Sequence, residues 1–439
     1  MKPRKMKDSG IPWIGQIPEG WNPTKIKYDF QVNAEKLAEN TADDFEFKYI
    51  DISSVNDLGK IISPPKMEFQ EAPSRARMVV RKGDVIISTV RTYLRAIAQI
   101  DENNRYVCST GFAVLRPHAD VDSRFAFYQM QSESIIQSIV SRSVGVSYPA
   151  ISPSELAATR ILHPNIEEQE RIATYLDGKC GEIDRVIAAK ERQNELLQAQ
   201  RAALISETVT KGLNPKVKFK DSGIEWIGKI PSTWWVKRLK HVLKNEKGAL
   251  RVGPFGSQLQ GADFSTTGFR VYDQRAVLDN DFKNGDKYVL EDKYNDLSAF
   301  TIAAGDILLT TRGTIGRVAI VPKDADEGII HPCLIRFRIN EEEVDSRFIA
   351  YLFNGTTILA EQFSYFSNAT TIEVIYSDVL KNVYMPCPSL PEQKQIAAYL
   401  DARCGEIDRV MAANEGMVAK LKAYRSSLIW EAVTGKVAV

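Results

Sequence analysis

Cysteine and histidine are scarce in this chain of 439 residues, which has five cysteines and four histidines. No two cysteines form a C-x-x-C pair, and the histidines are scattered along the sequence. A zinc site needs clustered ligands, and a catalytic cysteine needs a histidine that can be singled out as its partner. The sequence indicates neither kind of site, and we expect reduced thiols in a cytoplasmic protein.

Long apolar segments and an excess of charge of one sign are also lacking. No apolar run approaches the roughly 18 residues of a membrane span, and the basic N-terminus lacks the apolar segment of a secretion signal. The net charge is +1, with 44% hydrophobic and 26% charged residues, as in ordinary globular proteins. A polyanionic partner would therefore have to bind to a local basic surface. The length fits about three domains at roughly 150 residues each.

The motifs of nucleotide-binding and hydrolytic enzymes are missing as well. The sequence has no G-x-x-x-x-G-K-[ST] phosphate loop, no G-x-G-x-x-G fingerprint, no G-x-S-x-G elbow and no H-E-x-x-H helix. Acidic clusters at 43–44 and 341–343 lie in polar segments and are typical of a solvated surface. We therefore expect no catalysis by this chain.

Two blocks of sequence occur twice. Residues 7–27 and 220–240 share twelve of twenty-one positions at an offset of 213. Residues 167–212 and 391–436 share twenty-five of forty-six positions at an offset of 224, including an unbroken CGEIDRV. An internal repeat of this length is the strongest indication of the overall architecture that the sequence contains. A duplicated frame with divergent inserts predicts two lobes that present one geometry to two different targets.

The inserts, 28–166 and 241–390, read as divergent copies of one mixed α/β fold. Each has short β-branched runs bounded by Gly, Pro, Asp and Asn, which are strand signals. Gly83-Asp84 precedes VIISTV, and Gly305-Asp306 precedes ILLTT. The string VDSRF recurs at 121–125 and 344–348 before a helical stretch. Because the two block offsets differ by 11, the second insert is longer by eleven residues.

The blocks that begin at 167 and 391 read as long helices. The first has no proline from Glu168 to Thr210, and a span from Ile183 to Thr210 would be about 40 Å long at 1.5 Å per residue. A seven-residue spacing predicts a coiled-coil seam with polar interruptions at Lys190 and Asn414. The residues that we assign to this coiled coil or to partner binding are Ile183, Val186, Leu197, Leu204, Ile407, Val410, Leu421 and Leu428.

Three details of these helices stay open. Lys190 and Asn414 are either buried polar residues that set the register or solvated side chains. The glycines at 178, 181 and 405 predict a break near the helix start, since glycine weakens helix interiors. Cys180 and Cys404 occupy equivalent positions, where a small packed residue is the simplest interpretation.

Basic, amide, hydroxyl and aromatic residues gather in the divergent inserts. Arginine can bind guanine O6 and N7 together, Asn or Gln can do the same for adenine, and hydroxyl groups mostly hold phosphates. A single exposed residue of this kind needs no ligand, but two parallel sets of loops favour DNA binding. The candidate DNA-binding residues are Arg75, Arg77, Arg91, Tyr93, Arg95, Arg142, Ser147, Tyr148, Gln258, Gln274, Arg275, Arg312, Thr314, Arg317, Asn368 and Thr370.

The repeated motifs carry a resemblance to a known family. The opening motif D-S-G-I-x-W-I-G-x-I-P-x-x-W, the GDILLTTRGTIGRVAIV segment and the E-Q-x-x-I-A-x-Y-L-D helix start resemble the specificity subunit of Type I restriction–modification systems. The resemblance covers the whole chain. The first insert departs from it, because TVRTYLR stands where the second insert has TRGTIGR.

The resemblance implies an α+β chain with an internal pseudo-twofold repeat. Two target-recognition domains, 28–166 and 241–390, would each read one half of a bipartite, asymmetric double-stranded DNA site. The opening motifs at 1–27 and 220–240 would precede them. The long helices, in 167–219 and 391–439, would pack antiparallel, set the spacer between the half-sites and dock two methyltransferase subunits. S-adenosylmethionine would be bound by those subunits, and ATP and Mg by restriction subunits, with no cofactor in this chain.

Two other classes of function remain as alternatives. A duplicated hydrolase or transferase would need a convergent nucleophile, acid/base pair or metal set, which the sequence does not show. An adaptor that binds only proteins through its coiled coil would not need arginine-rich divergent loops. DNA binding whose logarithmic affinity falls linearly with the logarithm of salt concentration separates these alternatives from the resemblance.

Overall fold

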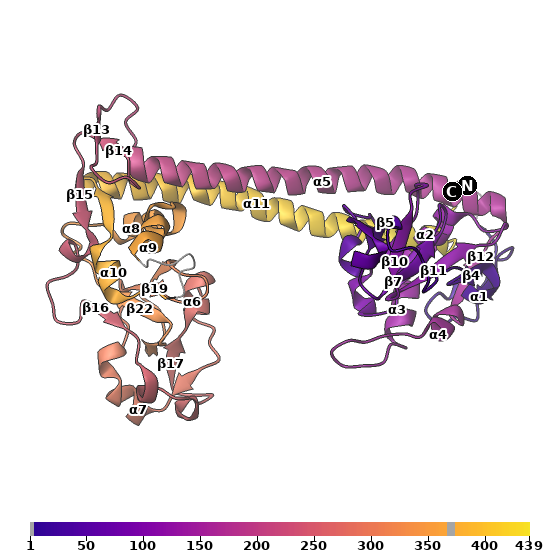
Figure 1. Ribbon diagram of the computed structural model, residues 1–439, viewed down its shortest axis with the longest axis horizontal. Coiled ribbons are helices and arrows are strands. Elements are labelled where there is room, and N and C mark those ends of the chain that lie inside the picture. The colour runs from indigo at the N-terminus through magenta and orange to yellow at the C-terminus, as the bar shows by residue number, and fades with distance from the viewer. Residues whose placement is uncertain (1–3, 367–373) are drawn as a thin grey trace. The chain divides into compact units, whose positions relative to one another are not determined.

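The computed structural model describes residues 4–366 and 374–439 (Figure 1). Its contacts divide the chain into unit 1, Met1–Arg192 with Asn414–Val439, and unit 2, Gln193–Ala413. The helices α5 (Ile166–Lys211) and α11 (Leu390–Val433) each contribute a segment to both units. The remainder of each unit is a mixed α/β domain, which confirms the predicted fold class.

Unit 1 is built on two four-stranded sheets. One is antiparallel, and its central strand β8 is buried along its whole length because VIIS has no charged residue to solvate. The other is mixed, with β10 parallel to β5 and antiparallel to β7. In spatial order, the first sheet is β4 (Phe30–Val32), β11 (Phe112–Pro117), β8 (Val85–Ser88) and β9 (Ile97–Gln99), and the second is β6 (Lys66–Glu68), β5 (Glu46–Ile50), β10 (Tyr106–Ser109) and β7 (Ala76–Val80).

Helices and two short strand pairs complete unit 1. Asp122 caps α2 by accepting hydrogen bonds from the backbone amides of Arg124 and Phe125, and Ser152 caps α4 with proline at its first turn. The helices are α1 (Ile26–Asp29), α2 (Ser123–Gln131), α3 (Glu133–Val140) and α4 (Pro153–Ala157). The antiparallel pairs are β1 (Met6–Asp8) with β2 (Gln16–Pro18) and β3 (Asn22–Lys25) with β12 (Arg160–His163).

Unit 2 repeats this plan with its own strands. The sheet β16-β22-β19-β20 corresponds to β4-β11-β8-β9, and β18-β17-β21 has the same parallel central pair as the mixed sheet of unit 1. Its strands are β13 (Phe219–Asp221), β14 (Lys229–Pro231), β15 (Trp235–Arg238), β16 (Leu250–Val252), β17 (Phe269–Tyr272), β18 (Tyr288–Val289), β19 (Ile307–Thr310), β20 (Val318–Ile320), β21 (Gly328–Ile330), β22 (Leu334–Phe337) and β23 (Tyr384–Cys387). Its other helices are α6 (Gln274–Leu278), α7 (Glu291–Asp296), α8 (Ser346–Gly355), α9 (Ile358–Phe366) and α10 (Ser377–Asn382).

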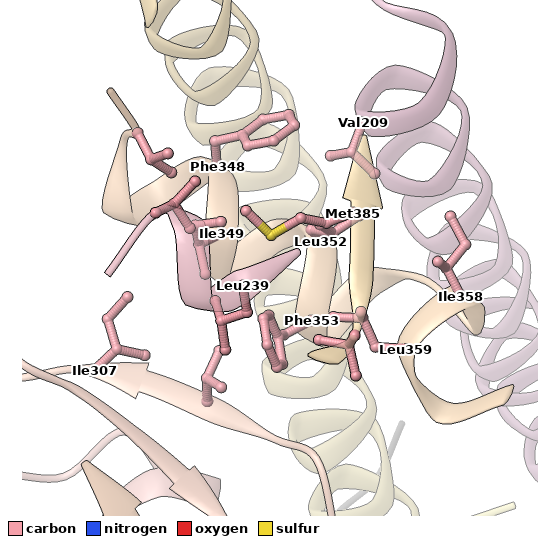
Figure 2. Packing of buried hydrophobic residues seen from close by; sticks show 14 of the residues in the cluster. Val209, Leu239, Ile307, Phe348, Ile349, Leu352, Phe353, Ile358, Leu359 and Met385 are labelled. Atoms are coloured by element: carbon pink, nitrogen blue, oxygen red, sulfur yellow. The ribbon is translucent and has the colours of Figure 1, made fainter. Parts of the chain in front are cut away.

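The main core of unit 2 joins the domain to the helices. Val209 of α5, Phe348 of α8, Leu359 of α9 and Met385 of β23 belong to one buried cluster, as Figure 2 shows. Trp234, between β14 and β15, is fully buried in the same cluster. This shared core fixes the mixed α/β domain of unit 2 to its own segments of α5 and α11.

The two long helices run antiparallel within each unit. In unit 2, Arg201 of α5 pairs with Asp408 of α11 at 2.9 Å. In unit 1, Asp184 of α5 pairs with Arg425 of α11 at 2.9 Å.

A second contact sets the direction in each unit, because Glu191 pairs with Lys422 at 3.7 Å in unit 1 and Asn194 donates to the carbonyl of Met411 at 3.3 Å in unit 2. In both units the partner's number on α11 falls as the number on α5 rises. Each residue of the two arginine–aspartate pairs is 224 positions from its counterpart in the other pair. The same contact therefore occurs once in each unit.

The helices correct two of the sequence-based expectations. α5 continues from Ile166 to Lys211 without the break predicted at its glycines, whose cost of about 1 kcal/mol each is outweighed by burial of one helix face. Val186 and Val410 are each 43% exposed and so lie outside the coiled-coil seam, while their alternative assignment to partner binding stays a prediction. Ile183 and Leu428 are buried, and Leu197, Leu204, Ile407 and Leu421 are half-buried.

The polar position Asn414 is buried, whereas Lys190 is half-buried. The interpretation as a buried polar residue is therefore confirmed for Asn414. Cys180 and Cys404 are also buried on the inner faces of α5 and α11, which confirms that they are packed small residues. Burial raises the pKa of the Cys180 thiol to about 11.

Candidate nucleic-acid interface

The Gly-Asp pair before β8 and β19 forms the base of each candidate interface. Gly83 and Gly305 have φ of +93° and +87°, which glycine adopts readily. The next residue, Asp84, is buried and accepts two hydrogen bonds from Arg116 of β11, at 3.0 and 2.9 Å. Asp306 accepts the same two bonds from Arg338, at 2.7 and 3.2 Å. These hydrogen bonds raise the pKa of both guanidinium groups, and the bidentate pairs fix the strand that carries each loop.

The loop after this strand has a similar backbone in the two units. Thr89 and Thr311 each donate their backbone N–H across the sheet, to the carbonyls of 111 and 333, at 2.8 and 2.9 Å. Arg91 lies in the left-handed region at φ of +50°, where its counterpart Gly313 has +65°. The arginine-rich TVRTYLR and the glycine-containing TRGTIGR therefore follow similar paths with different side chains.

A second loop of unit 1, residues 143–150, lies against the first. The backbone N–H of Arg91 donates to the carbonyl of Pro149 at 2.7 Å. The Arg91 guanidinium lies 4.3 Å from the ring centre of Tyr148, an exposed side chain. Ser147 and Tyr93 are exposed elsewhere in these two loops. The structure therefore brings two candidate residues, Arg91 and Tyr148, into contact from loops far apart in sequence.

Other arginines of unit 1 are held by neighbouring side chains. Arg95 makes two hydrogen bonds to Glu133, at 2.8 and 3.0 Å. Arg75 pairs with Asp51 at 3.0 Å. Arg77 lies 4.7 Å from the ring centre of Phe69. These contacts orient the guanidinium groups but leave those of Arg75 and Arg95 partly open to solvent.

Arg142 lies within a network of internal hydrogen bonds. Its guanidinium donates to the carbonyl oxygens of Ser138, at 2.8 Å, and Glu155, at 3.0 Å, and to the hydroxyl of Thr159, at 2.5 Å. Burial lowers the pKa of this guanidinium. These bonds give Arg142 a positioning role, since it ties α3 to the segment that follows the exposed loop.

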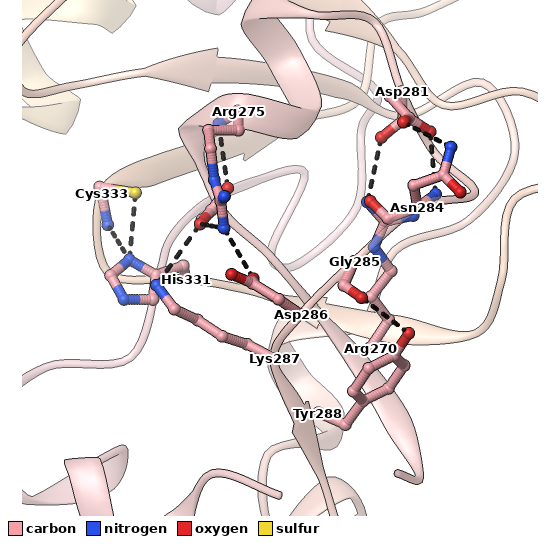
Figure 3. A network of polar contacts seen from close by, with 11 residues as sticks. Arg270, Arg275, Asp281, Asn284, Gly285, Asp286, Lys287, Tyr288, His331 and Cys333 are labelled. Atoms are coloured by element: carbon pink, nitrogen blue, oxygen red, sulfur yellow. Dashed lines mark hydrogen bonds and ion pairs between the residues drawn. The ribbon is translucent and has the colours of Figure 1, made fainter. Parts of the chain in front are cut away.

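One candidate of unit 2, Arg275, belongs to a polar network beside β17 and β18 (Figure 3). Arg275 of α6 pairs with Asp286 at 2.6 Å and with Asp273 at 3.5 Å, and the hydrogen bond to Asp286 raises its pKa. Lys287 reaches Asp273 at 3.5 Å. Beside them, His331 Nδ1 lies 3.0 Å from Cys333 Sγ. The pKa of the His331 imidazole is lowered, mainly by burial.

The glycine-containing loop of unit 2 presents Arg312 and Thr314 to solvent. Arg317 is also exposed and donates to the carbonyl of Asn354 at 2.7 Å. Gln274 lies beside this loop, because a side chain at 313 would come within 3.5 Å of its amide group. Gln258 accepts a hydrogen bond from a local backbone amide at 3.0 Å and is exposed. Asn368 and Thr370 lie outside the described residues.

Several positioning residues were not identified from the sequence. Asp177 of α5 accepts hydrogen bonds from Arg124 and Tyr128 of α2, at 2.9 Å each. Both contacts recur in unit 2 at 2.8 Å, through the counterparts Arg347, Tyr351 and Asp401. The signal was present, because the VDSRF string and the YLD string both repeat. Arg270, buried in β17, holds the turn after α6 through the carbonyls of Asp281 and Asn284.

No group of three or more His, Cys, Asp or Glu side chains that could hold a metal ion occurs within residues 4–366 and 374–439. Across these same residues, no helix combines the length and apolar character needed to cross a membrane.

A comparison with protein-family models matches residues 18–197 and 231–408 to the Type I restriction modification DNA specificity domain. The two matches cover most of the chain and fall one on each repeat. The chain belongs to this family. Its specificity-subunit relatives include the Type I restriction enzyme MjaVIII specificity subunit of Methanocaldococcus jannaschii, 26% identical over 73% of this chain and 71% of the relative.

The Type I restriction enzyme StySPI specificity subunit of Salmonella potsdam is 21% identical over 96% of this chain and 90% of the relative. Among solved structures, a chain from a study of complex assembly and conformational transition of the type I R-M system matches with a TM-score of 0.70. It is 23% identical and covers 96% of this chain and 99% of its own length. This likeness supports the fold of the specificity subunit.

Proposed function

We propose that this specificity subunit reads a bipartite, asymmetric DNA site, with one half-site read by each unit. The observation that supports the proposal most directly is the pair of matching loops after β8 and β19. They share hydrogen-bonded backbone paths but differ in side chains, with Arg91 in one and Gly313 in the other. Loops of one shape with different side chains are suited to two docking sites of similar geometry and different sequence.

The long helices would set the spacer and dock two methyltransferase subunits. Identical partners need identical surfaces, and the residues that the two repeats share lie in the frame. The contacts of Asp177 and Asp401, and the ion pairs of Asp184 and Asp408, recur at equivalent positions. The repeated frame therefore offers two equivalent places for one kind of partner.

Catalysis would belong to the partner subunits. S-adenosylmethionine would be bound by the methyltransferase subunits, and ATP and Mg by restriction subunits. In this chain the buried carboxylates of Asp84 and Asp306 pair with the arginine side chains of Arg116 and Arg338, and these pairs fix strands. The chain's own part would be to bind and orient the DNA.

A domain exchange tests the division into two readers. Residues 28–166 are replaced by the corresponding insert of a relative, and methylated positions are sequenced in a host that carries the complete system. We expect one half-site to change and the other to stay the same. A change in both half-sites would contradict independent reading.

A helix insertion tests the spacer. Four residues are inserted after Gln198 in α5, and a matched insertion is made in the exposed turn at 214–216 as a control. We expect the helix insertion to alter the spacer without altering either half-site. An unchanged spacer would refute this role for α5.

A further inference from the structure

The sequence contains two Asn-Gly pairs, Asn284-Gly285 and Asn354-Gly355, and both lie in unit 2. Asparagine is chemically labile, because its side chain loses ammonia when the backbone nitrogen of the next residue attacks the amide carbon. Glycine hinders this attack least, since it has no Cβ. Both asparagine side chains are exposed, so water reaches both. The two pairs therefore compare the same two residues in different surroundings.

The Asn354-Gly355 pair is held by its surroundings. Both residues lie within α8, where the backbone nitrogen of Gly355 belongs to the ladder of helix hydrogen bonds. The Asn354 side chain is fixed at both ends, because Oδ1 accepts from the backbone N–H of Val318 at 3.0 Å and Nδ2 donates to the Val318 carbonyl at 2.9 Å. Gly355 also packs closely on α5, since a Cβ there would lie 2.1 Å from the Ile205 side chain. Attack by the Gly355 nitrogen would have to break these contacts.

The Asn284-Gly285 pair lies in an exposed turn, outside the helices and strands (Figure 3). The Asn284 amide donates from Nδ2 to Asp281 Oδ2 at 2.9 Å, and its Oδ1 accepts no hydrogen bond within residues 4–366 and 374–439. In the same described part of the chain, the backbone N–H of Gly285 has no acceptor. The attacking nitrogen and the oxygen of the attacked amide are therefore not held by hydrogen bonds.

A buried arginine lies at the peptide group of this turn. Arg270 of β17 is 3% exposed and donates from Nη2 to the carbonyl of Asn284. When the Gly285 nitrogen loses its proton, negative charge spreads onto this oxygen, and the guanidinium stabilises it. The carbonyl of Asn354 likewise accepts from Arg317 at 2.7 Å. The arginine contact is thus common to both pairs, and the helix and the side-chain hydrogen bonds are what distinguish them.

We propose that Asn284 is a site of spontaneous modification, at which the side-chain amide loses ammonia, whereas the fold protects Asn354. The Gly285 nitrogen gives up its proton and forms a bond to Cγ of Asn284, and the bond between Cγ and Nδ2 breaks. Nδ2 leaves as ammonia with one added proton, and a five-membered succinimide ring remains. Water then opens the ring at either carbonyl and gives aspartate or isoaspartate at position 284. The inference does not depend on the proposed function.

The product changes a turn of unit 2 alone, because the sequence of unit 1 has no Asn-Gly pair. The Asn284 amide now donates to the Asp281 carboxylate at 2.9 Å. An aspartate at 284 puts a second carboxylate at this place, and like charges at such a distance repel. The nearby Asp286 pairs with Arg275, a candidate DNA-binding residue, at 2.6 Å. The modification therefore adds negative charge beside this pair.

The test follows both asparagines in the native full-length chain during storage in mildly alkaline buffer. Protease fragments are analysed by mass spectrometry, which detects the replacement of the amide by a carboxyl group and distinguishes aspartate from isoaspartate by fragmentation. We expect Asn284 to be converted at least about tenfold faster than Asn354, which corresponds to about 1.4 kcal/mol in activation free energy. Both aspartate and isoaspartate should be found at position 284.

The same chain in concentrated urea is the matched control. Both pairs are then unfolded Asn-Gly sequences, so their rates should become similar. Asn284→Gln is the second control, because its longer side chain would have to close a six-membered ring. This variant should lose its amide at 284 at least about tenfold more slowly than the wild type, while conversion of Asn354 stays unchanged. Circular dichroism and the thermal unfolding midpoint check that it is folded.

Asn284→Asp supplies the aspartate product in a homogeneous chain. Hydrogen exchange of the Lys283 backbone amide, which donates to Asp281, should be about two- to fivefold faster in this variant at neutral pH, because the second carboxylate weakens the turn. Exchange of the Leu58 amide, which donates to Asn56 in unit 1, should stay the same.

The proposal is overturned if the native chain converts Asn354 as fast as Asn284. It is also overturned if Asn284 stays intact over the time in which the chain in urea converts both sites, or if Asn284→Gln loses its amide at the wild-type rate. Aspartate without isoaspartate would assign the reaction to direct hydrolysis by water and would refute ring closure. Unchanged exchange of the Lys283 amide in Asn284→Asp would refute the effect on the turn.

Discussion

The two units contain the same helix–helix ion pair in different surroundings. Arg425 and Asp184 of unit 1 have side chains that are only 8% and 10% exposed, whereas those of Arg201 and Asp408 in unit 2 are 37% and 51% exposed. The two pairs have the same separation of 2.9 Å. The two pairs differ in their shielding from solvent. In unit 1, the backbone carbonyl of Leu58 accepts a hydrogen bond from Arg425 and so places a turn of the chain against the pair. The repeat therefore preserves the contact, whereas the inserts determine how far it is shielded from solvent.

The largest expected effect comes from breaking the pair in each unit. Arg425→Ala leaves the Asp184 carboxylate buried without its partner and should lower the free energy of unfolding by about 3–5 kcal/mol. Arg201→Ala leaves Asp408 in contact with water and should cost less than about 1 kcal/mol. Urea unfolding followed by circular dichroism measures both. Equal losses would show that the surroundings do not set the contribution of the pair.

A second comparison concerns the two buried tryptophans of the opening motifs. Trp21 donates to Glu168 at 2.8 Å, and Trp234 donates to Glu392 at 3.0 Å. Replacing either tryptophan by phenylalanine removes a hydrogen bond to a charged group, worth about 1.5–3 kcal/mol. Glu168 also pairs with Arg4 at 2.7 Å, so it keeps a partner and the loss in unit 1 should be the smaller one.

The matched control for the tryptophans is Arg4→Ala. In that background Trp21→Phe should cost as much as Trp234→Phe, because Glu168 then has neither partner. Thermal unfolding midpoints of the four variants decide this. If Arg4→Ala leaves the difference between the two tryptophans unchanged, the arginine is not its cause.

The loops after β8 and β19 give a smaller contrast. It is opposite to that of the ion pairs, because the larger loss of stability is expected in unit 2. Arg91 lies in a left-handed conformation that costs most residues about 1–2 kcal/mol, and glycine avoids that cost but loses more chain entropy on folding. Arg91→Gly should therefore change the free energy of unfolding by less than about 1 kcal/mol. Gly313→Ala imposes the left-handed strain on unit 2 and should lower that free energy by about 1 kcal/mol.

DNA binding separates the two loop variants further. Arg91→Gly should weaken binding of the assembled complex by about 1–3 kcal/mol if the guanidinium contacts a base. Substituting base pairs of the unit 1 half-site should then discriminate less strongly, while the other half-site keeps its full effect. Binding that weakens equally for every DNA sequence would assign Arg91 to a phosphate.

Much of the fold could be predicted from the sequence because its strongest signal is internal repetition. Matching blocks predicted two long helices, and the Gly-Asp pairs predicted strands where β8 and β19 begin. The break at the helix glycines was wrong because helix continuity depends on the burial of a whole face, not on one residue. Val186 and Val410 were assigned to the coiled coil or to partner binding, and their exposure contradicts only the coiled-coil assignment, which spacing along the helix could not decide.

The candidate interface was less predictable, because the partners of a side chain depend on residues far away in the sequence. The sequence shows which loops are basic, but it does not show whether a guanidinium already has internal partners. Arg142 donates to groups of three residues within its own unit, whereas Tyr148 and Arg91, from separate loops, come together only in the folded domain. The turn at residues 56–60 of unit 1 carried no signal, because it contacts residues more than 300 positions away, such as Lys422, which pairs with Asp57.

The smallest expected effect concerns the turn that follows the central strand of each mixed sheet. Asp281 closes the turn of unit 2 by accepting hydrogen bonds from the amides of Lys283 and Asn284, at 2.9 Å each, and these bonds lower its pKa from 3.8 to about 2. The turn of unit 1 is closed by Asn56, which does not titrate in this range. A lowered pKa in the folded state means that the stabilisation is fully present above about pH 4 and is lost as the pH falls through about 2.

Hydrogen exchange of the backbone amides of Lys283 and Asn284 should therefore speed up between pH 4 and 2, after correction for the intrinsic rate, while that of Leu58 and Lys60 should not. In Asp281→Asn the difference between the two turns should disappear, and if it persists, the carboxylate is not what makes the turn of unit 2 sensitive to acid.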